Sequence, residues 1–177
     1  KDFASSMDYI LPNQVAQIFL NMGGIGPVLD VGAGTGLGGQ ALAKLGINPI
    51  DALDLSDEML EVAAKKKIYR SLFTSDITQR IETSNYLYQG VISSGTFTHG
   101  HVGPNAIDNL LSVASTGALF ALSINKKHWF EKGFAKKFEA LSNRIEKLIL
   151  HDVEIYGKNS KGEHSDDLGV VATFCKV

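Results

Sequence analysis

A strand, a glycine-rich loop and a helix are predicted in succession over residues 28–39, the arrangement of many sites that bind nucleotide-like ligands. Glycine has no Cβ, so such a loop lets bare backbone approach the ligand closely. The loop contains no Lys or Arg, and the carboxylate of Asp30 stands at its start. A pyrophosphate would gain little from that acid, whereas a ligand with a cationic centre would be attracted by it. These residues therefore favour S-adenosylmethionine (SAM), whose sulfonium and amino groups are positively charged.

The same glycines allow two other interpretations. A structural tight turn would use one or two glycines, but residues 32–39 contain five, which favours a ligand loop. Residues 34–39 also satisfy the GxGxxG pattern of dinucleotide-binding proteins, so an NAD(P)-dependent oxidoreductase is an alternative function. In a dehydrogenase the first glycine should follow the strand directly, and Gly34 comes too late for that.

Asp54 is the second acid of the expected site, at the end of the next predicted strand. It stands about twenty residues after Gly34, where an acid binds ribose hydroxyls in nucleotide-binding sheets. A carboxylate can accept hydrogen bonds from two hydroxyls. The alternative is a solvated acid at a strand end.

His99 and His101 flank Gly100 beyond a predicted strand at residues 88–93. An unperturbed imidazole titrates near roughly pH 6.5, so either could take a proton from a hydroxyl or amine as a methyl group leaves the sulfonium. We therefore assign both as candidate catalytic residues. The alternative is that one bonds a loop carbonyl and the other faces water. The pair has no third ligand near it in the sequence, so we expect no metal site.

The elements that must position these residues alternate between strand and helix. Apolar patterns and turn residues predict strands at residues 28–31, 50–55, 69–75, 88–93, 118–124, 149–156 and 170–177. Helices are predicted at residues 12–22, 37–45 and 104–114, and after Ser56, which caps a helix with acids in its first turn. One apolar face of a further long helix is indicated by the alternating spacings of four and three between Phe134, Phe138, Leu141, Ile145 and Leu148.

This alternation predicts an α/β fold: a doubly wound, mostly parallel, seven-stranded sheet with helices on both faces and an antiparallel last strand. The ligand of such a sheet lies at the carboxyl ends of the strands. We expect one domain over residues 1–177, with residues 1–22 as an N-terminal lid and residues 126–149 covering the substrate. Trp129, Phe130 and Phe134 could line an acceptor pocket, although large aromatics are more often core.

The order of elements and motifs resembles the class I SAM-dependent methyltransferases over nearly the whole chain. LDVGAGTG at residues 29–36 is similar to their first motif, and residues 93–104 hold the position of their fourth. The resemblance implies that Asp54 holds both ribose hydroxyls, Met59 packs on the adenine, and Asp76 accepts its amino group. The candidate cofactor-binding residues are then Tyr9, Asp30, Gly32, Ala33, Gly34, Gly36, Asp54, Leu55, Met59, Asp76, Ile77 and Ser93. Residues 56–60 and 93–104 also resemble the methyltransferase-like proteins named after the Williams–Beuren syndrome region.

Three of these residues also have a plain structural interpretation. Asp30 could bond the amides of the loop itself, and this role could coexist with placing the ligand's amino group through water. Met59 lies on an apolar helix face and could be part of the core. Asp76 could cap a short helix at residues 77–81.

Composition narrows the classes of function. With 177 residues, 44% of them hydrophobic, the chain can bury a sizeable core in one domain. The formal net charge of −2 gives no general attraction to nucleic acid or anionic membranes, and no apolar run approaches the roughly 20 residues that span a bilayer. The single cysteine, Cys175, allows no disulfide within the chain. No signal peptide is visible, so we expect a cytoplasmic protein.

We therefore expect a SAM-dependent methyltransferase that transfers a methyl group to an oxygen or nitrogen of a small-molecule acceptor, with S-adenosylhomocysteine (SAH) as product. No Asn/Asp-Pro-Pro-aromatic motif follows the predicted strand at residues 88–93, which argues against amino methylation of nucleic-acid bases. The alternative from another class is a protein that binds SAM or SAH without turnover. We make no prediction of the oligomeric state.

Overall fold

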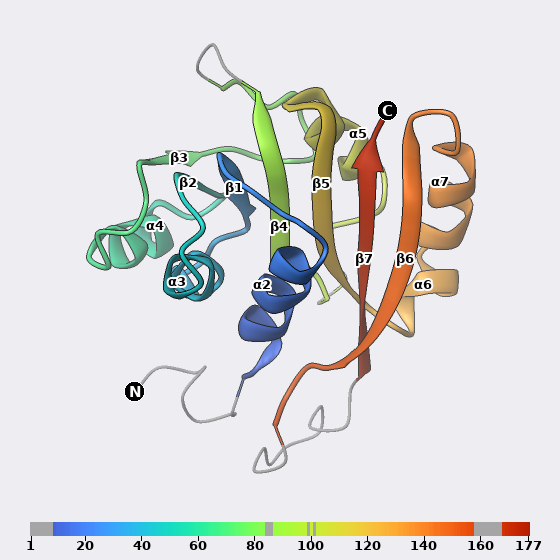
Figure 1. Ribbon diagram of the computed structural model, residues 1–177. Coiled ribbons are helices and arrows are strands. Elements are labelled where there is room, and N and C mark those ends of the chain that lie inside the picture. Colours follow the sequence, from blue (N-terminus) through green and yellow to red (C-terminus); the bar gives the residue numbers. More distant parts are fainter. Residues whose placement is uncertain (1–8, 84–86, 99, 101, 158–167) are drawn as a thin grey trace.

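Seven strands form a single sheet in the order β3-β2-β1-β4-β5-β7-β6 (Figure 1). The computed structural model describes residues 9–83, 87–98, 100, 102–157 and 168–177. The strands are β1 (Val28–Val31), β2 (Ile50–Asp54), β3 (Ser71–Thr74), β4 (Tyr88–Phe97), β5 (Ala114–Asn125), β6 (Ile145–Glu154) and β7 (Leu168–Lys176). Neighbouring strands from β3 to β5 are parallel, whereas β7 is antiparallel to both β5 and β6. The predicted mostly parallel sheet with an antiparallel last strand is confirmed, and β7 lies inside the sheet with β6 at its edge.

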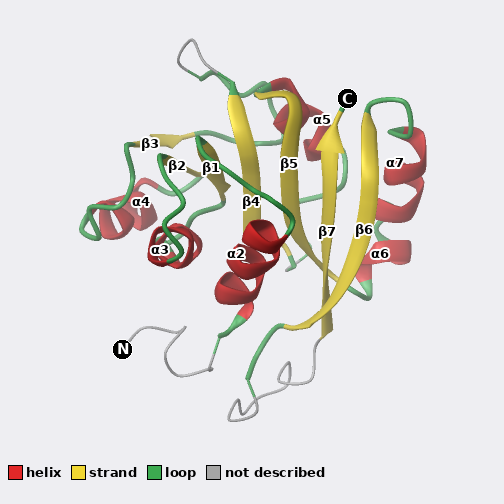
Figure 2. Ribbon diagram, in the orientation of Figure 1, coloured by secondary structure: helices red, strands yellow, loops and turns green. Residues whose placement is uncertain are grey.

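Helices cover both faces of the sheet, as predicted (Figure 2). They are α2 (Leu11–Asn21), α3 (Leu37–Lys44), α4 (Asp57–Ala64), α5 (Ala106–Ser112), α6 (His128–Glu131) and α7 (Phe134–Ala140). Val28 of β1 packs in one core cluster with Phe19 of α2 and Leu42 of α3. The next residue, Leu29, packs in a second cluster with residues of α5 and α7. Because both faces are covered, the central strands are nearly continuous apolar runs.

The direction in which the strands are added reverses at β1. The chain passes from β1 to β2 and β3 on one side and then returns to β4 on the other. In open α/β sheets a ligand crevice lies outside the carboxyl ends of the strands at such a point. Since β1 ends at Val31, the glycine loop at residues 32–36 begins at the mouth of this crevice.

The predicted long helix through Leu148 is wrong in its second half. α7 ends at Ala140, and β6 begins at Ile145, which pairs with Lys176 of β7. Ile145 is buried in the same core cluster as Phe138, whereas Leu148 is 40% exposed. α7 and β6 both bury apolar residues in the same core. The spacing of these residues along the chain therefore resembles that of one long helix.

β4 and β5 are both longer than predicted, and each carries an irregularity. β4 continues past Ser93 to Phe97, across a shift in its register with β5, and so brings residues 94–96 to the crevice. β5 begins at Ala114 and includes Gly117, whose φ of +82° accompanies a second register shift. The short helix considered at residues 77–81 does not form, and residues 77–79 make a turn.

Candidate functional site

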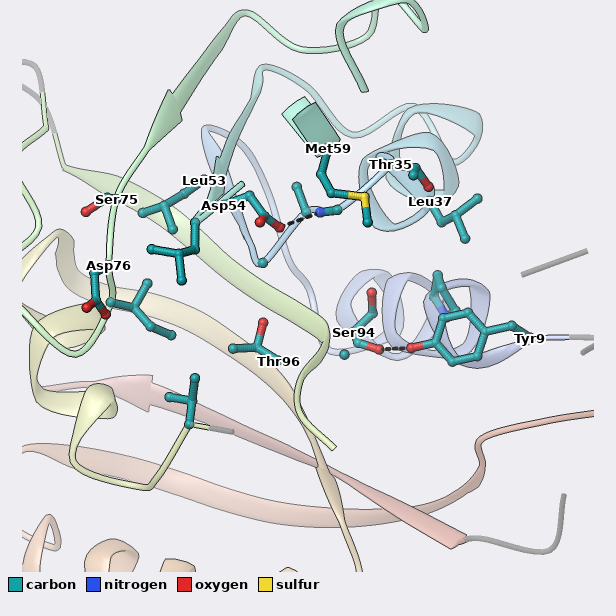
Figure 3. Close-up of a pocket in the computed structure, with 18 of the residues that line it drawn as sticks. Tyr9, Thr35, Leu37, Leu53, Asp54, Met59, Ser75, Asp76, Ser94 and Thr96 are labelled. Carbon is teal, nitrogen blue, oxygen red and sulfur yellow. Dashed lines mark hydrogen bonds between the residues drawn. The ribbon is translucent and has the colours of Figure 1, made fainter. Parts of the chain in front are cut away.

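A pocket of about 750 Å³ opens at the carboxyl ends of β1 to β4 (Figure 3). This volume is in the range of small-molecule and cofactor sites. Predicted cofactor-binding residues that line it are Tyr9, Gly32, Ala33, Gly34, Asp54, Leu55, Met59, Asp76 and Ile77. Lining residues that sequence reasoning missed are Pro12, Thr35, Leu37, Leu53, Ser75, Ser94, Gly95, Thr96, Val102 and Tyr156. The fold thus gathers most of the predicted set around one cavity.

Gly32 is the position in the loop at which a side chain is excluded most strictly. Its φ is +64°, and a Cβ at this position would lie 1.9 Å from Thr96 Oγ1. That hydroxyl donates a hydrogen bond to the Val31 carbonyl at 3.2 Å and so ties β4 to the end of β1. The amides of Gly32 and Ala33 donate to the Leu53 carbonyl at 2.8 and 3.1 Å. The loop is therefore held against the neighbouring strands on both sides.

Asp54 lies at the end of β2 with its carboxylate already oriented by backbone amides. Oδ2 accepts a hydrogen bond from the Gly34 amide at 2.7 Å, and Oδ1 accepts one from the Ser56 amide at 3.0 Å. Each carboxylate oxygen can accept more than one hydrogen bond, so both can still receive a ligand hydroxyl. Ser56 also caps α4 as predicted, because its Oγ accepts from the Met59 amide at 3.3 Å.

Asp76 is also held by its own loop and lines the pocket. Its Oδ1 accepts hydrogen bonds from Thr78 Oγ1 at 2.6 Å and from the Thr78 amide at 2.8 Å. These two bonds lower the pKa of Asp76 below its ordinary value, the hydroxyl contributing most. The side chain therefore stays ionised, as an acceptor for donor groups of a ligand.

Met59 lies beside the pocket and not in the core. Its side chain is 46% exposed, and it projects from α4 toward the cavity in Figure 3. The interpretation of Met59 as core is therefore wrong. The next residue, Leu60, is the one that α4 buries against the sheet.

Three predicted cofactor-binding residues do not line the pocket, and Asp30 is the first. It is 1% exposed and lies beneath the loop, where its Oδ2 accepts hydrogen bonds from Tyr69 Oη at 2.7 Å and from the Gly39 amide at 2.8 Å. The alternative, that Asp30 bonds the amides of the loop itself, is confirmed. Burial raises the pKa of Asp30 to about 6, although the bonds from Tyr69 and Gly39 oppose the rise.

Gly36 and Ser93 are the other two predicted residues outside the pocket. Gly36 has a φ of +87°, and a Cβ there would meet Tyr69 at 3.1 Å and Ala63 at 3.2 Å, so it packs on α4. Ser93 is fully buried, and its Oγ has no hydrogen-bond partner among the described residues. β4 runs further than predicted, so the positions that reach the crevice are 94–96.

Tyr9 closes one end of the pocket together with Tyr156. The Tyr9 hydroxyl donates a hydrogen bond to the Ser94 carbonyl (Figure 3), and an isolated antiparallel bridge joins Tyr9 to Tyr156. The two ring centroids are 5.7 Å apart, with the planes inclined at 48°. Burial, and then the neighbouring Tyr156, raise the pKa of Tyr9 above its usual range. The Tyr9 phenol is therefore neutral and cannot serve as a base.

The histidines predicted as catalytic, His99 and His101, lie outside the described residues. Val102, the residue after them, lines the pocket. The predicted substrate-covering segment does not reach it: none of residues 126–149 is among the lining residues. Trp129 packs on the core instead, and Phe130 is 80% exposed.

The charged side chains of the pocket are all acidic in the part of the chain that the structure describes. Asp54 and Asp76 line the cavity, and no described Lys, Arg or His does so. The field inside the pocket therefore attracts a cation and repels a phosphorylated ligand. The described residues include no group of three or more His, Cys, Asp or Glu placed to hold a metal ion. None of the described helices has the length and apolar character needed to cross a membrane.

Comparison with known proteins identifies a family whose members transfer methyl groups, which is consistent with an acidic pocket. Residues 28–117 match the model of a family described as a methyltransferase domain, and the chain belongs to that family. It is a SAM-dependent methyltransferase, with SAM as its cofactor. The oxidoreductase alternative is therefore wrong. A search of curated proteins found no match.

Solved structures share the fold at low sequence identity. The N-methyltransferase NodS from Bradyrhizobium japonicum WM9, in complex with SAH, has a TM-score of 0.69 at 14% identity, covering 93% of this chain and 85% of that chain. A TehB-like SAM-dependent methyltransferase from Corynebacterium glutamicum has a TM-score of 0.63 at 20% identity, covering 92% and 87%. A protein from Pyrococcus horikoshii with a proposed RNA methyltransferase activity has a TM-score of 0.68 at 15% identity, covering 94% and 84%.

Proposed function

We propose that this methyltransferase transfers the methyl group of SAM to an oxygen or nitrogen of a small-molecule acceptor. The observation that carries the proposal is that one pocket is lined by Asp54, Met59 and Asp76, with Tyr9 across the cavity from Asp76. In this proposal Asp76 accepts the adenine amino group, Met59 packs on the adenine, and Asp54 accepts the ribose hydroxyls. The methionine part then extends along the glycine loop toward Ser94.

The reaction needs alignment more than it needs a reactive side chain. The acceptor's lone pair attacks the methyl carbon in line with the sulfur, and the electron pair of the broken C–S bond stays on sulfur to give neutral SAH. The sulfonium is already activated, so the protein contributes by placing the acceptor and by excluding water. His99 and His101 remain our predicted bases for an acceptor that must lose a proton.

The charge of the chain and of the pocket supports a small acceptor over a nucleic acid. The net charge is −2, and the described lining residues supply no cation to pair with a phosphate. A nucleic-acid substrate would call for clustered Lys and Arg side chains around the opening. We also propose the cytoplasm as the compartment. A narrower kinship with the methyltransferase-like proteins of the Williams–Beuren region is proposed on residues 56–60 and 93–104.

Isothermal titration with SAM, SAH, NAD and NADP tests the cofactor assignment. We expect SAM and SAH to bind and the two dinucleotides to give no heat, because the acids at the pocket repel a pyrophosphate. A metabolite library, assayed for SAH release, then tests the acceptor class. Turnover on RNA with no turnover on any small molecule would overturn the proposal.

A further inference from the structure

Tyr9 and Tyr156 form an aromatic corner in the pocket. The corner lies at the end away from Asp76, the acid proposed to bind the adenine. Tyr9 and Ser94 lie across the cavity from Asp76 in Figure 3. The contact between the two rings, 5.7 Å between centroids, places Tyr156 at the same end. The planes are inclined at 48°, so the two rings meet as a corner, and both residues line the pocket. Tyr9 precedes α2 and Tyr156 follows β6, and the bridge between them fixes their relative position.

The chemistry of this end of the pocket selects for positive charge. An ammonium group over the face of a tyrosine is attracted by the ring quadrupole, and aromatic corners of this type bind alkylated ammonium ions. The acids at the opposite end, Asp54 and Asp76, add to the attraction, and no described lining residue carries a compensating positive charge. The residues that lie beside Tyr9, Pro12 and Gly95, carry no charge.

We propose that the Tyr9–Tyr156 corner is the acceptor subsite and that the acceptor is an organic amine, bound as its ammonium ion. This inference rests on the proposed function and names the acceptor class. The ammonium loses one proton to bulk water before the methyl transfer, a step that needs no side-chain base, so an amine acceptor does not require the predicted bases His99 and His101. The resulting nitrogen lone pair attacks the methyl carbon of SAM. The new N–C bond forms as the C–S bond breaks, sulfur keeps the electron pair, and the positive charge passes to the methylated nitrogen. Tyr156 acts here as a positioning residue.

Three probes that share a phenethyl group test the charge preference without knowledge of the natural acceptor. They are phenethylammonium, phenethyl alcohol and hydrocinnamate, which are a cation, a neutral molecule and an anion on the same aromatic scaffold. Each is titrated into wild-type protein saturated with SAH, so that the nucleoside end of the pocket is occupied. We expect phenethylammonium to bind at least tenfold more tightly than hydrocinnamate, with the alcohol between them. Equal binding of the three, or tighter binding of the anion, would overturn the inference.

Variants at Tyr156 then test whether the aromatic face is responsible. Tyr156→Leu removes the π face, and we expect it to weaken phenethylammonium at least fivefold while the affinity for the alcohol changes by less than twofold. Tyr156→Phe keeps the ring and should bind phenethylammonium within twofold of wild type. Phe130→Leu, at an exposed ring outside the pocket, is the matched control and should change nothing.

The affinity for SAH separates failure of this inference from failure of the proposed function. We expect all three variants to bind SAH as wild type does. If Tyr156→Leu weakens SAH and phenethylammonium alike, the corner contacts the cofactor and the inference is wrong. If the wild-type protein does not bind SAH at all, the proposed function itself fails. Should Tyr156→Leu not fold, the three-probe series on wild-type protein still tests the charge preference, and hydrocinnamate bound as tightly as phenethylammonium would overturn the inference.

Discussion

The Gly34 amide and the Asp54 carboxylate, 20 residues apart in the chain, are joined by a hydrogen bond of 2.7 Å. Gly34 belongs to the loop after β1, and Asp54 closes β2, so this bond makes the loop and the end of β2 one unit. A ligand that bonds Asp54 is therefore placed relative to the loop as well. This link between the two strand ends gives the first prediction.

Asp54→Ala should weaken SAH binding without unfolding the chain. Loss of hydrogen bonds to a charged group costs about 1.5–3 kcal/mol each, which is roughly a tenfold to hundredfold rise in Kd for one bond. Titration calorimetry measures this directly. Asp57→Asn, three residues further on and outside the pocket, is the control and should bind SAH normally. Equal affinities in the two variants would mean that the ribose lies elsewhere.

Gly32→Ala should lower the free energy of unfolding, and Thr96→Ala in the same chain should restore part of the loss. The single change forces a Cβ to within 1.9 Å of Thr96 Oγ1 and adds backbone strain of roughly 1–2 kcal/mol. Removing that hydroxyl relieves the overlap and leaves the strain. Gly117→Ala is the matched control, because its φ is +82° and nothing lies within 4 Å of the added Cβ. Urea unfolding of wild type, Gly32→Ala, Thr96→Ala and the double variant gives the cycle, and additive effects would contradict the predicted clash.

Met59→Ala and Leu60→Ala should separate binding from stability on two adjacent residues. Met59 is 46% exposed beside the pocket, and Leu60 is 6% exposed in the core. We expect Met59→Ala to raise the Kd for SAH severalfold with almost no change in melting temperature. Leu60→Ala should lower stability by about 2–5 kcal/mol, the usual range for a buried leucine. Calorimetry measures the affinity for SAH, and thermal unfolding measures the stability. A clear loss of stability in Met59→Ala would show that Met59 contributes to the core.

Asp30 should make stability fall as the pH rises toward neutrality. Burial raises its pKa from 3.8 to about 6, so the folded state holds the proton more tightly than the unfolded state. The stabilising effect of protonation is complete below about pH 4 and is lost as the pH rises through 6. At about 1.4 kcal/mol for each pKa unit, the change is on the order of 3 kcal/mol.

Asp30→Asn removes this titration and keeps an acceptor oxygen for Gly39 and Tyr69, which both donate to one carboxylate oxygen in the wild-type chain. Urea unfolding of both proteins between pH 4.5 and 7.5 tests the effect. The wild-type chain should lose stability relative to the variant as the pH increases. Parallel profiles would show that Asp30 does not titrate in this range.

The parts of the fold that the sequence predicts well are those that depend on neighbours in the chain. β1 has the predicted bounds, and the cap of α4 at Ser56 depends only on residues 56–59. The boundary between α7 and β6 is different, because β6 forms by pairing with β7 and not by its local pattern. Ile145 suits either element, and only the pairing with Lys176 decides between them.

The residues of the site also differ in whether local sequence or long-range packing determines their place. Asp54 and the glycines follow from local spacing, because a ligand loop and the end of the next strand have a fixed offset in such sheets. Ser94 and Thr96 could have been found by extending β4 past Ser93. Tyr156 gives no local signal, because its place beside Tyr9 results from long-range packing. The depth of Asp30 beneath the loop has no signature in the sequence, so its type and position alone favour a contact with the ligand.

The pairing of Tyr9 with Tyr156 has a consequence for the chain during its synthesis. The glycine loop is synthesised before Tyr156, but the wall that Tyr9 and Tyr156 form is incomplete until residue 156 has been added and β6 has joined the sheet. A nascent chain that ends before that point has an incomplete pocket, in which the methyl donor would be exposed to solvent. Methyl transfer is therefore a property that the polypeptide acquires only once β6 and β7 have both been synthesised and have paired.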